Sequence, residues 1–287
     1  MEFSRRKKES KDAEKSPLFE QPDVSKNLAA IKHKIAVISG KGGVGKSTVS
    51  ANFAVALSQR NSVRVGLLDA DIDGPNIPKM LRIEEQQISI VDGKIMPVSV
   101  SENLKVISMA FLLQDKNMPV IWRGPMKASA IRQFLGDVSW GALDYLIIDL
   151  PPGTGDAPLS IAQLIEGMDG MIVVTTSQEV ALMDSRKAIN FAKALNVPVI
   201  GVIENMSGLK CPYCGKKIDL FTTGGGERAA LQFGVPFLGR VPFEPEIVKA
   251  ADFGLPFVRQ YPSSEAAEAF TQIVAEVIEF VEGDDSA

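Results

Sequence analysis

Three sets of residues in this sequence have types and spacings suited to chemistry, and the first is a glycine-rich stretch with two lysines. Its members are Gly40, Lys41, Gly42, Gly43, Val44, Gly45, Lys46, Ser47 and Thr48. They fit the pattern G-x-x-x-x-G-K-[ST] of a phosphate-binding loop, in which backbone N–H groups surround an anion. In that pattern Lys46 reaches the β- and γ-phosphates, and the Ser47 hydroxyl is a ligand of Mg²⁺. The stretch therefore predicts binding of a nucleoside triphosphate with Mg²⁺.

The second set consists of carboxylates that follow apolar segments. Asp69, Asp71 and Asp73 alternate after one apolar run, and Asp149 follows another. Parallel sheets place their ligand crevice at the carboxyl ends of the strands, where acids can meet Mg²⁺ and phosphates. Asp149 precedes the turn-prone string P-P-G-T-G-D and is predicted to act on Mg²⁺ through a water molecule. Asp69 is expected to support the phosphate site, and solvated turn residues are the alternative interpretation of these acids.

The third set is the pair Cys211 and Cys214, spaced C-x-x-C, and the chain has no other cysteine. A glutaredoxin-like redox string would need its own thioredoxin-type unit near the start of a domain. A zinc or iron–sulfur site of four thiolates would need a second pair of cysteines. A pair that binds nothing is the remaining alternative, and the spacing by itself does not choose between these three.

The elements that must position these residues alternate along the chain. Strands are predicted for the apolar runs at 35–38, 63–68, 104–109, 144–149, 171–176, 197–203 and 235–242, and helices at 49–57, 124–134, 180–195 and 273–281. A β-hairpin is predicted around Asp92–Gly93, and His33 is expected on an exposed flank before the first strand. Strands that alternate with helices predict an α/β fold with a mainly parallel, doubly wound sheet covered by helices on both faces.

Length and composition limit the class of protein. The 287 residues are 45% hydrophobic with a net charge of −4, which argues against nucleic-acid binding as the main activity. No run of roughly 18 apolar residues occurs, so no membrane span is predicted. We expect a flexible charged arm at residues 1–28 and a single phosphate-loop ATPase domain at 29–283, with a C-x-x-C metal loop at 208–218. The charged N-terminus does not resemble a secretory signal, and we expect a cytoplasmic protein.

The full string K-G-G-V-G-K-S-T at 41–48 resembles the deviant phosphate-loop ATPases, a group that includes MinD, ParA, the nitrogenase iron protein and the Mrp/ApbC carriers. The string D-L-P-P-G-T-G-D at 149–156 is most similar to the Mrp/ApbC carriers, and W-R-G-P-M at 122–126 is also similar to them. In this group the early lysine, here Lys41, crosses a dimer interface to the partner's nucleotide. The resemblance also implies that Asp71 orients the attacking water and that Asn205 recognises the adenine base.

This resemblance covers roughly residues 33–282 and implies a homodimeric ATPase of the nitrogenase-iron-protein fold with slow turnover. Its catalytic residues would be Lys41, Lys46 and Asp71, and its magnesium residues would be Ser47, Asp71 and Asp149. Cys211 and Cys214 would pair with those of the second subunit to hold a bridging [4Fe–4S] cluster for delivery to apo iron–sulfur proteins. Zinc is the alternative metal. Because the first 210 residues contain no cysteine, any cluster must be this bridging, labile one.

Two other functions remain open on the sequence. One is a MinD/ParA-like positioning ATPase that binds membrane or DNA. The acidic chain end at 276–285 disfavours it, because anionic lipid or phosphate would repel that segment. The other is a nucleotide switch in which the cysteines hold a purely structural zinc ion.

Overall fold

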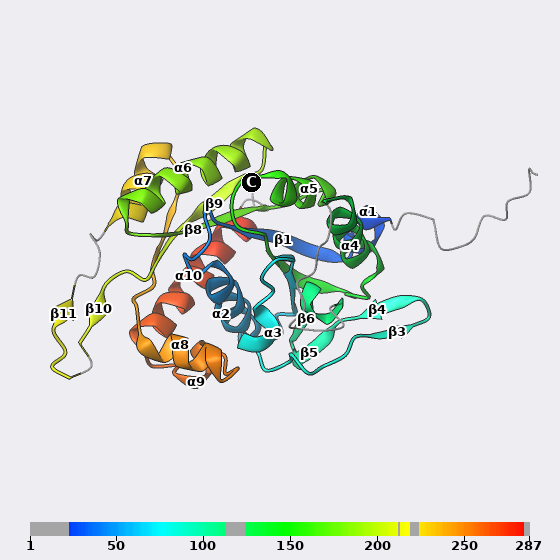
Figure 1. Ribbon diagram of the computed structural model, residues 1–287, viewed down its shortest axis with the longest axis horizontal. Helices are drawn as coiled ribbons and strands as arrows, with labels where there is room; N and C mark the ends of the chain where they lie inside the picture. Colours follow the sequence, from blue (N-terminus) through cyan, green and yellow to red (C-terminus); the bar gives the residue numbers. More distant parts are fainter. Residues whose placement is uncertain (1–22, 113–123, 212, 219–223, 284–287) are drawn as a thin grey trace, which may run out of the picture.

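The computed structural model describes residues 23–112, 124–211, 213–218 and 224–283 (Figure 1). Within these residues an eight-stranded sheet has the order β12-β9-β8-β1-β7-β2-β6-β5. Its strands are β1 Ile31–Ile38, β2 Val65–Asp69, β5 Val98–Ser101, β6 Leu104–Ser108, β7 Leu143–Asp149, β8 Gly170–Thr176, β9 Val199–Asn205 and β12 Phe237–Arg240. All neighbours are parallel except β5 and β6. The mainly parallel sheet predicted from the sequence is confirmed.

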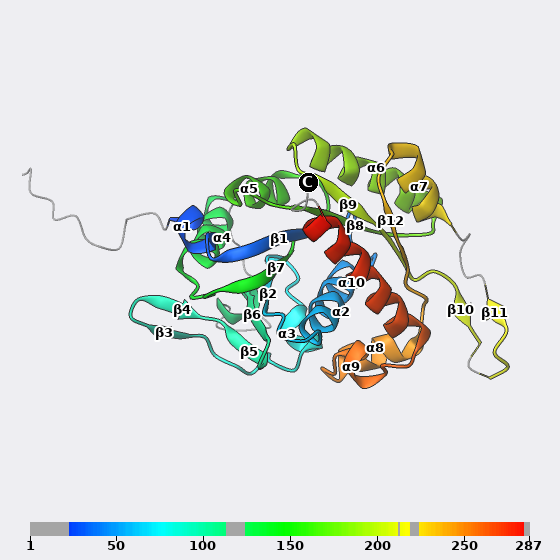
Figure 2. The same ribbon diagram turned by 180° about the vertical axis from the view of Figure 1, so that it is seen from behind.

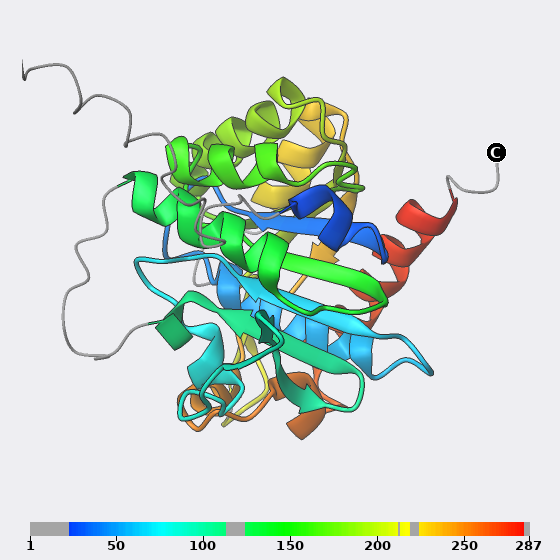
Figure 3. The same ribbon diagram turned by 90° about the vertical axis from the view of Figure 1, so that its right-hand side faces the viewer.

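Helices cover both faces of the sheet, as Figures 1 and 3 show. One face carries α2 Lys46–Ser58, α3 Ile77–Met80, α8 Pro245–Asp252, α9 Phe257–Gln260 and α10 Glu265–Gly283. The other carries α1 Val24–Leu28, α4 Gly124–Asp137, α5 Asp156–Leu164, α6 Glu179–Ala194 and α7 Gly225–Phe233. A 3₁₀ turn, Met109–Leu112, follows β6. Successive side chains of β1 point to opposite faces of the sheet. Ile35 and Val37 pack in the layer that contains α2, and Ala36 and Ile38 pack in the layer that contains α4.

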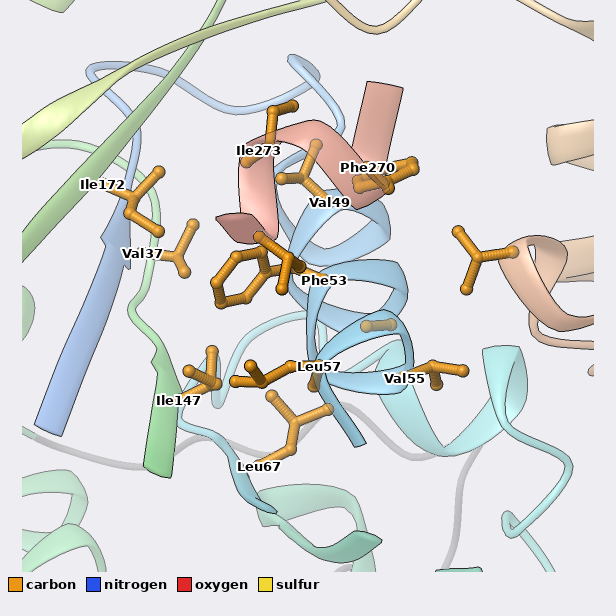
Figure 4. Packing of buried hydrophobic residues seen from close by; sticks show 14 of the residues in the cluster. Val37, Val49, Phe53, Val55, Leu57, Leu67, Ile147, Ile172, Phe270 and Ile273 are labelled. Carbon is orange, nitrogen blue, oxygen red and sulfur yellow. The ribbon is translucent and has the colours of Figure 1, made fainter. Parts of the chain in front are cut away.

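The helix that follows the phosphate-binding loop, α2, is buried on several sides. Phe53 is directed toward the strands that carry Val37 and Ile147, while Val49 lies beside Ile273 of α10 (Figure 4). Figure 2 shows α10 crossing this side of the molecule next to α2. Because α2 packs on both the sheet and the last helix, its N-terminus and the loop before it are held in a fixed position.

The structure corrects the expectation for His33, which is the second residue after the start of β1 and not an exposed flank. Its ring is buried, stacks on Tyr145 and lies with Nδ1 3.0 Å from Asp169 Oδ1. The predicted hairpin is confirmed as β3 Ser89–Val91 and β4 Lys94–Met96, and Asp92 and Gly93 have the positive φ angles of such a turn.

Residues 23–28, which were predicted to belong to a flexible charged arm, are part of the fold. Asp23 caps the short helix α1, accepting a hydrogen bond from the Lys26 N–H group, and Val24 and Leu28 are buried in the layer that contains α4. Residues 1–22 and the pair Trp122–Arg123 lie outside the described residues. Among the helices that are described, none is long and apolar enough to cross a membrane.

Candidate functional site

The predicted phosphate-binding loop lies between β1 and α2, at the carboxyl edge of the sheet. Gly43 and Gly45 have φ angles of 81° and 79°, a left-handed conformation that residues with a Cβ atom rarely adopt. Gly45 directly precedes α2, and a Cβ atom there would lie 2.3 Å from Asn205 Nδ2. The loop therefore has the backbone form that directs N–H groups, and the positive end of α2, toward an anion.

Lys46, Ser47 and Asp149 come together behind this loop. Lys46 Nζ lies 2.8 Å from Asp149 Oδ2, and the Ser47 hydroxyl donates to the same oxygen at 2.6 Å. The other carboxylate oxygen of Asp149 accepts a hydrogen bond from Ser50 Oγ at 2.6 Å. Asp149 is fully buried. Sequence reasoning missed Ser50, although it lies four residues after Lys46 and therefore on the same face of α2.

Asp69 is the neighbour of Asp149 across the sheet, since the two residues are in register on β2 and β7. Asp69 accepts a hydrogen bond from Ser108 Oγ at 2.9 Å, and it too is fully buried. Burial, together with the nearby charge of Asp149, raises the pKa of Asp69 to about 8. Two buried carboxyl groups thus lie beside one lysine, and one of them holds its proton at neutral pH.

Asp71 lies further out, in the turn that follows β2. Its Oδ1 atom accepts hydrogen bonds from the N–H groups of Asp73 and Gly74, both at 3.2 Å. Burial raises the pKa of Asp71 above its ordinary value, while the charge of Lys46 opposes this shift. In this conformation the predicted catalytic carboxylate caps its own turn.

An open cavity of about 440 Å³ separates this turn from the segment after β7, which corresponds to the P-P-G-T-G-D string. Its lining residues are Asp71, Asp73, Gly74, Pro151, Pro152, Gly155, Asp156, Ala157 and Pro158. Gly153, with a φ angle of 89°, donates its N–H to the carbonyl oxygen of Ser39 at 2.9 Å. The segment thus contacts the start of the phosphate-binding loop and faces Asp71 across the cavity.

A second cavity, of about 150 Å³, adjoins the other side of the loop. It is lined by Thr48, Asn205, Met206, Pro242, Phe243, Glu244, Ile247, Val248, Ala251 and Asp252. Asn205, the last residue of β9, is buried, and its Nδ2 donates to the carbonyl oxygen of Val44 at 2.9 Å. The predicted base-recognition residue therefore contacts the phosphate-binding loop and borders a cavity beside it.

Cys211 and Cys214 lie on a separate hairpin, formed by β10 Leu209–Lys210 and β11 Lys217–Ile218, that projects from the body of the fold (Figure 1). Both thiols are free, and Cys211 is partly exposed while Cys214 is exposed. A hydrogen bond from the backbone N–H of Tyr213, and a weaker contribution from that of Cys214, lower the pKa of the Cys211 thiol. Hydrogen bonds from backbone to sulfur favour the thiolate, which is the form that binds metals. The hairpin thus suits a metal ligand pair.

This pair supplies two of the four thiolates that a zinc or iron–sulfur site of this kind needs. In the part of the chain that the structure describes, no three or more His, Cys, Asp or Glu side chains gather as a metal site. Lys41, which belongs to the phosphate-binding loop, is partly exposed. The structure therefore places the nucleotide residues and the two cysteines in different parts of the chain.

Comparison with known proteins gives consistent matches over most of the chain. The family described as NUBPL iron-transfer P-loop NTPase (ParA) matches residues 30–278. The chain is 51% identical to the iron-sulfur cluster carrier protein of Methanocaldococcus jannaschii, over 95% of this chain and 93% of that protein. It is 48% identical to the protein of the same name from Saccharolobus solfataricus, over 90% and 87%.

Solved structures agree with these matches. A nucleotide-binding protein of Archaeoglobus fulgidus, in complex with ADP, superposes with a TM-score of 0.72 at 39% identity and covers 82% of this chain and 91% of its own. The MinD cell division protein of Aquifex aeolicus has a TM-score of 0.61 at 20% identity, covering 86% and 97%, which shows a shared fold. The resemblance that the sequence motifs indicate is confirmed.

Proposed function

The chain belongs to the family of NUBPL iron-transfer P-loop NTPases, and we propose that it is an ATP-hydrolysing carrier of iron–sulfur clusters. In this proposal a homodimer holds one [4Fe–4S] cluster and delivers it to apo iron–sulfur proteins. The observation that carries the proposal is the exposed hairpin with two thiols, one of them favoured as thiolate, attached to a nucleotide-binding fold. Relatives at 46–51% identity are named as cluster carriers.

The nucleotide would bind with its phosphates on the N–H groups of the loop and its base in the 150 Å³ cavity beside Asn205. Lys46 Nζ lies 2.8 Å from Asp149 Oδ2, and it would turn from that carboxylate toward the β- and γ-phosphates. The Ser47 hydroxyl and Asp149 would hold Mg²⁺, which supplies positive charge against the phosphates. Both residues fit this role, because the Ser47 hydroxyl in the first turn of α2 lies 2.6 Å from the carboxylate of Asp149 at the end of β7.

Hydrolysis would use residues that lie at the edge of this site. Asp71 borders the open cavity and would orient the attacking water once it leaves the N–H groups of Asp73 and Gly74. Lys41 would act in the partner's site, where its charge would stabilise the transition state as an arginine finger does. We expect slow turnover, because the site is complete only in the dimer.

The cluster is the cargo of this protein. A four-thiolate site needs two chains, because each supplies Cys211 and Cys214 alone. A cluster shared between two exposed hairpins can leave when their separation changes, which suits delivery to another protein. Free thiols persist in a reducing compartment, so we place this activity in the cytoplasm.

The test measures iron, acid-labile sulfide and zinc after reconstitution of the purified full-length protein without oxygen. We expect about four irons and four sulfides per dimer, as one four-thiolate cluster requires. The variant with Cys211→Ala and Cys214→Ala should lose the cluster and keep nucleotide binding. Lys46→Met should lose nucleotide binding and keep the cluster. Stoichiometric zinc that iron and sulfide cannot replace would refute the carrier and leave a structural zinc site.

A further inference from the structure

The cysteine hairpin lies between β9 and α7 in the chain, and one buried carboxylate, Glu204, contacts described residues on both sides of it. Glu204 Oε1 accepts hydrogen bonds from Ser207 Oγ at 2.5 Å, on the segment that leads out, and from the Gly224 N–H at 3.2 Å. Its Oε2 atom accepts from the Gly226 N–H at 2.6 Å, at the start of α7 where the chain returns. The side chain of Glu204 is fully buried at the end of β9.

The glycines at the start of α7 lie close to this carboxylate. A Cβ atom on Gly226 would lie 2.9 Å from Glu204 Cβ, nearer than such atoms approach, and Gly224 has a φ angle of 82°. The positive end of α7 faces the carboxylate, and Arg240 Nε lies 3.6 Å from its Oε1 atom. Arg240 also pairs with the exposed carboxylate of Glu227. The charge of Glu204 is thus matched by a helix terminus and one arginine, and it fixes the place where α7 begins.

The same segment that leads to the cysteines forms a wall of the nucleotide side. Asn205, which follows Glu204, donates a hydrogen bond to the carbonyl oxygen of Val44 in the phosphate-binding loop. Asn205 and Met206 both line the 150 Å³ cavity. Main-chain hydrogen bonds join residues 204–208 to the facing cavity wall: Val241 N to Glu204 O, Ser207 N to Val241 O and Phe243 N to Gly208 O. A displacement of this wall must therefore move the outgoing root of the hairpin.

We propose that Glu204 is the positioning residue that makes the geometry of Cys211 and Cys214 depend on the bound nucleotide. A hairpin held at one root could swivel and absorb a movement of the cavity wall. Because Glu204 ties the outgoing segment at Ser207 to the start of α7, the movement is passed to the hairpin. This inference rests on the proposed function for the meaning of the coupling, but its test uses protein without metal.

The test measures the rate at which the two thiols react with Ellman's reagent in the metal-free, full-length protein, with and without Mg–AMPPNP. The chain has no other cysteine, so the signal comes from the hairpin. In the wild type we expect the nucleotide to change the rate by about fivefold or more, the low end of usual allosteric couplings. Glu204→Gln keeps the size but places an amide N–H₂ against N–H donors, so the ratio should fall close to one. Its affinity for a fluorescent ADP analogue should stay within about twofold, because Glu204 itself does not line the cavity.

The matched control is Glu227→Gln, which removes a charge from the same Arg240 cluster, because the side chain of Glu227 pairs with Arg240. It should keep the wild-type ratio. The inference would be overturned if Mg–AMPPNP changed the thiol reaction rate of Glu204→Gln as much as that of the wild type. It would also be overturned if the nucleotide did not change the thiol reaction rate of the wild type. If Glu204→Gln fails to bind nucleotide, Ser207→Ala provides the test, because it removes the hydrogen bond from Ser207 Oγ to Glu204. A wild-type ratio of thiol reaction rates in Ser207→Ala would also refute the proposed role of Glu204. The carrier proposal is tested independently by the iron and sulfide assay, so its failure can be distinguished from failure of this inference.

Discussion

Asp69 allows a quantitative test of the electrostatics of the phosphate site. This carboxyl group is fully buried beside Asp149, on the neighbouring strand. Burial, followed by the negative charge of Asp149 as the smaller cause, raises the pKa of Asp69 from its usual value of 3.8 to about 8. The replacement Asp69→Asn keeps the size and polarity of the side chain but removes its titration.

The sign of the effect follows from proton binding. Between pH 4 and pH 8 the folded protein keeps the proton of Asp69, whereas the unfolded chain has lost it. The free energy of unfolding therefore falls as the pH rises through this window, with a slope of about 1.4 kcal/mol per pH unit. From pH 6 to pH 8 the wild type should lose about 2 kcal/mol on this account, and the loss should level off above pH 8. Asp69→Asn should lack this decline.

The assay is urea unfolding of the purified protein at pH 6, 7 and 8, followed by tryptophan fluorescence, to which the buried Trp140 contributes. Asp144→Asn is the control. Despite partial burial, hydrogen bonds from Lys32 and Arg64 lower the pKa of Asp144 to about 2, so it is ionised in both states over this range. Its pH slope should match that of the wild type. Equal slopes for the wild type and Asp69→Asn would refute the assignment of a protonated Asp69.

Three further substitutions test contacts around the site. Ser50→Ala should destabilise the fold by about 1–3 kcal/mol in urea unfolding, because a buried oxygen of Asp149 loses its donor; an unchanged stability would contradict that contact. Tyr145→Phe should cost about 1 kcal/mol and speed proteolysis at the end of α10, because the phenol donates to Glu282 at 2.6 Å. Burial raises the pKa of Tyr145, so its hydroxyl keeps the proton that it donates to Glu282. The loss of stability in Tyr145→Phe should therefore be constant up to about pH 9. Phe53→Ala should cost about 3–5 kcal/mol in thermal unfolding, and Phe53→Leu, its control, less than about 1.5.

Much of the fold follows from local patterns in the sequence. The central strands are continuous apolar runs because both faces of the sheet are covered, and β7 was predicted to within a residue for this reason. The pattern fails where burial depends on distant partners. Helix α1 lies in a charged stretch, and its two buried side chains find their partners in the layer of α4. His33 is similar, because its burial depends on Tyr145 and Asp169, which are far away in the sequence.

The candidate site divides in the same way. The phosphate-binding loop and Asp149 were found because their spacing is fixed by the chemistry of phosphate and Mg²⁺. Their supporting residues follow no such rule. Ser108 reaches Asp69 from the next strand, and Glu204 reaches α7 across twenty residues of chain, so only the fold brings them together.

The charges of the phosphate site nearly balance one another. Lys46 balances Asp149, and the proton on Asp69 removes the second negative charge, so the buried cluster is close to neutral. A nucleotide that recruits Lys46 takes away the only ammonium group in contact with Asp149 among the described residues, and it adds the charge of its phosphates. A buried carboxylate without a partner is costly, so binding of the nucleotide must bring a cation to Asp149. The protein should therefore bind Mg–ATP much more tightly than ATP in the presence of a chelator, and equal affinities would show that Lys46 does not exchange partners.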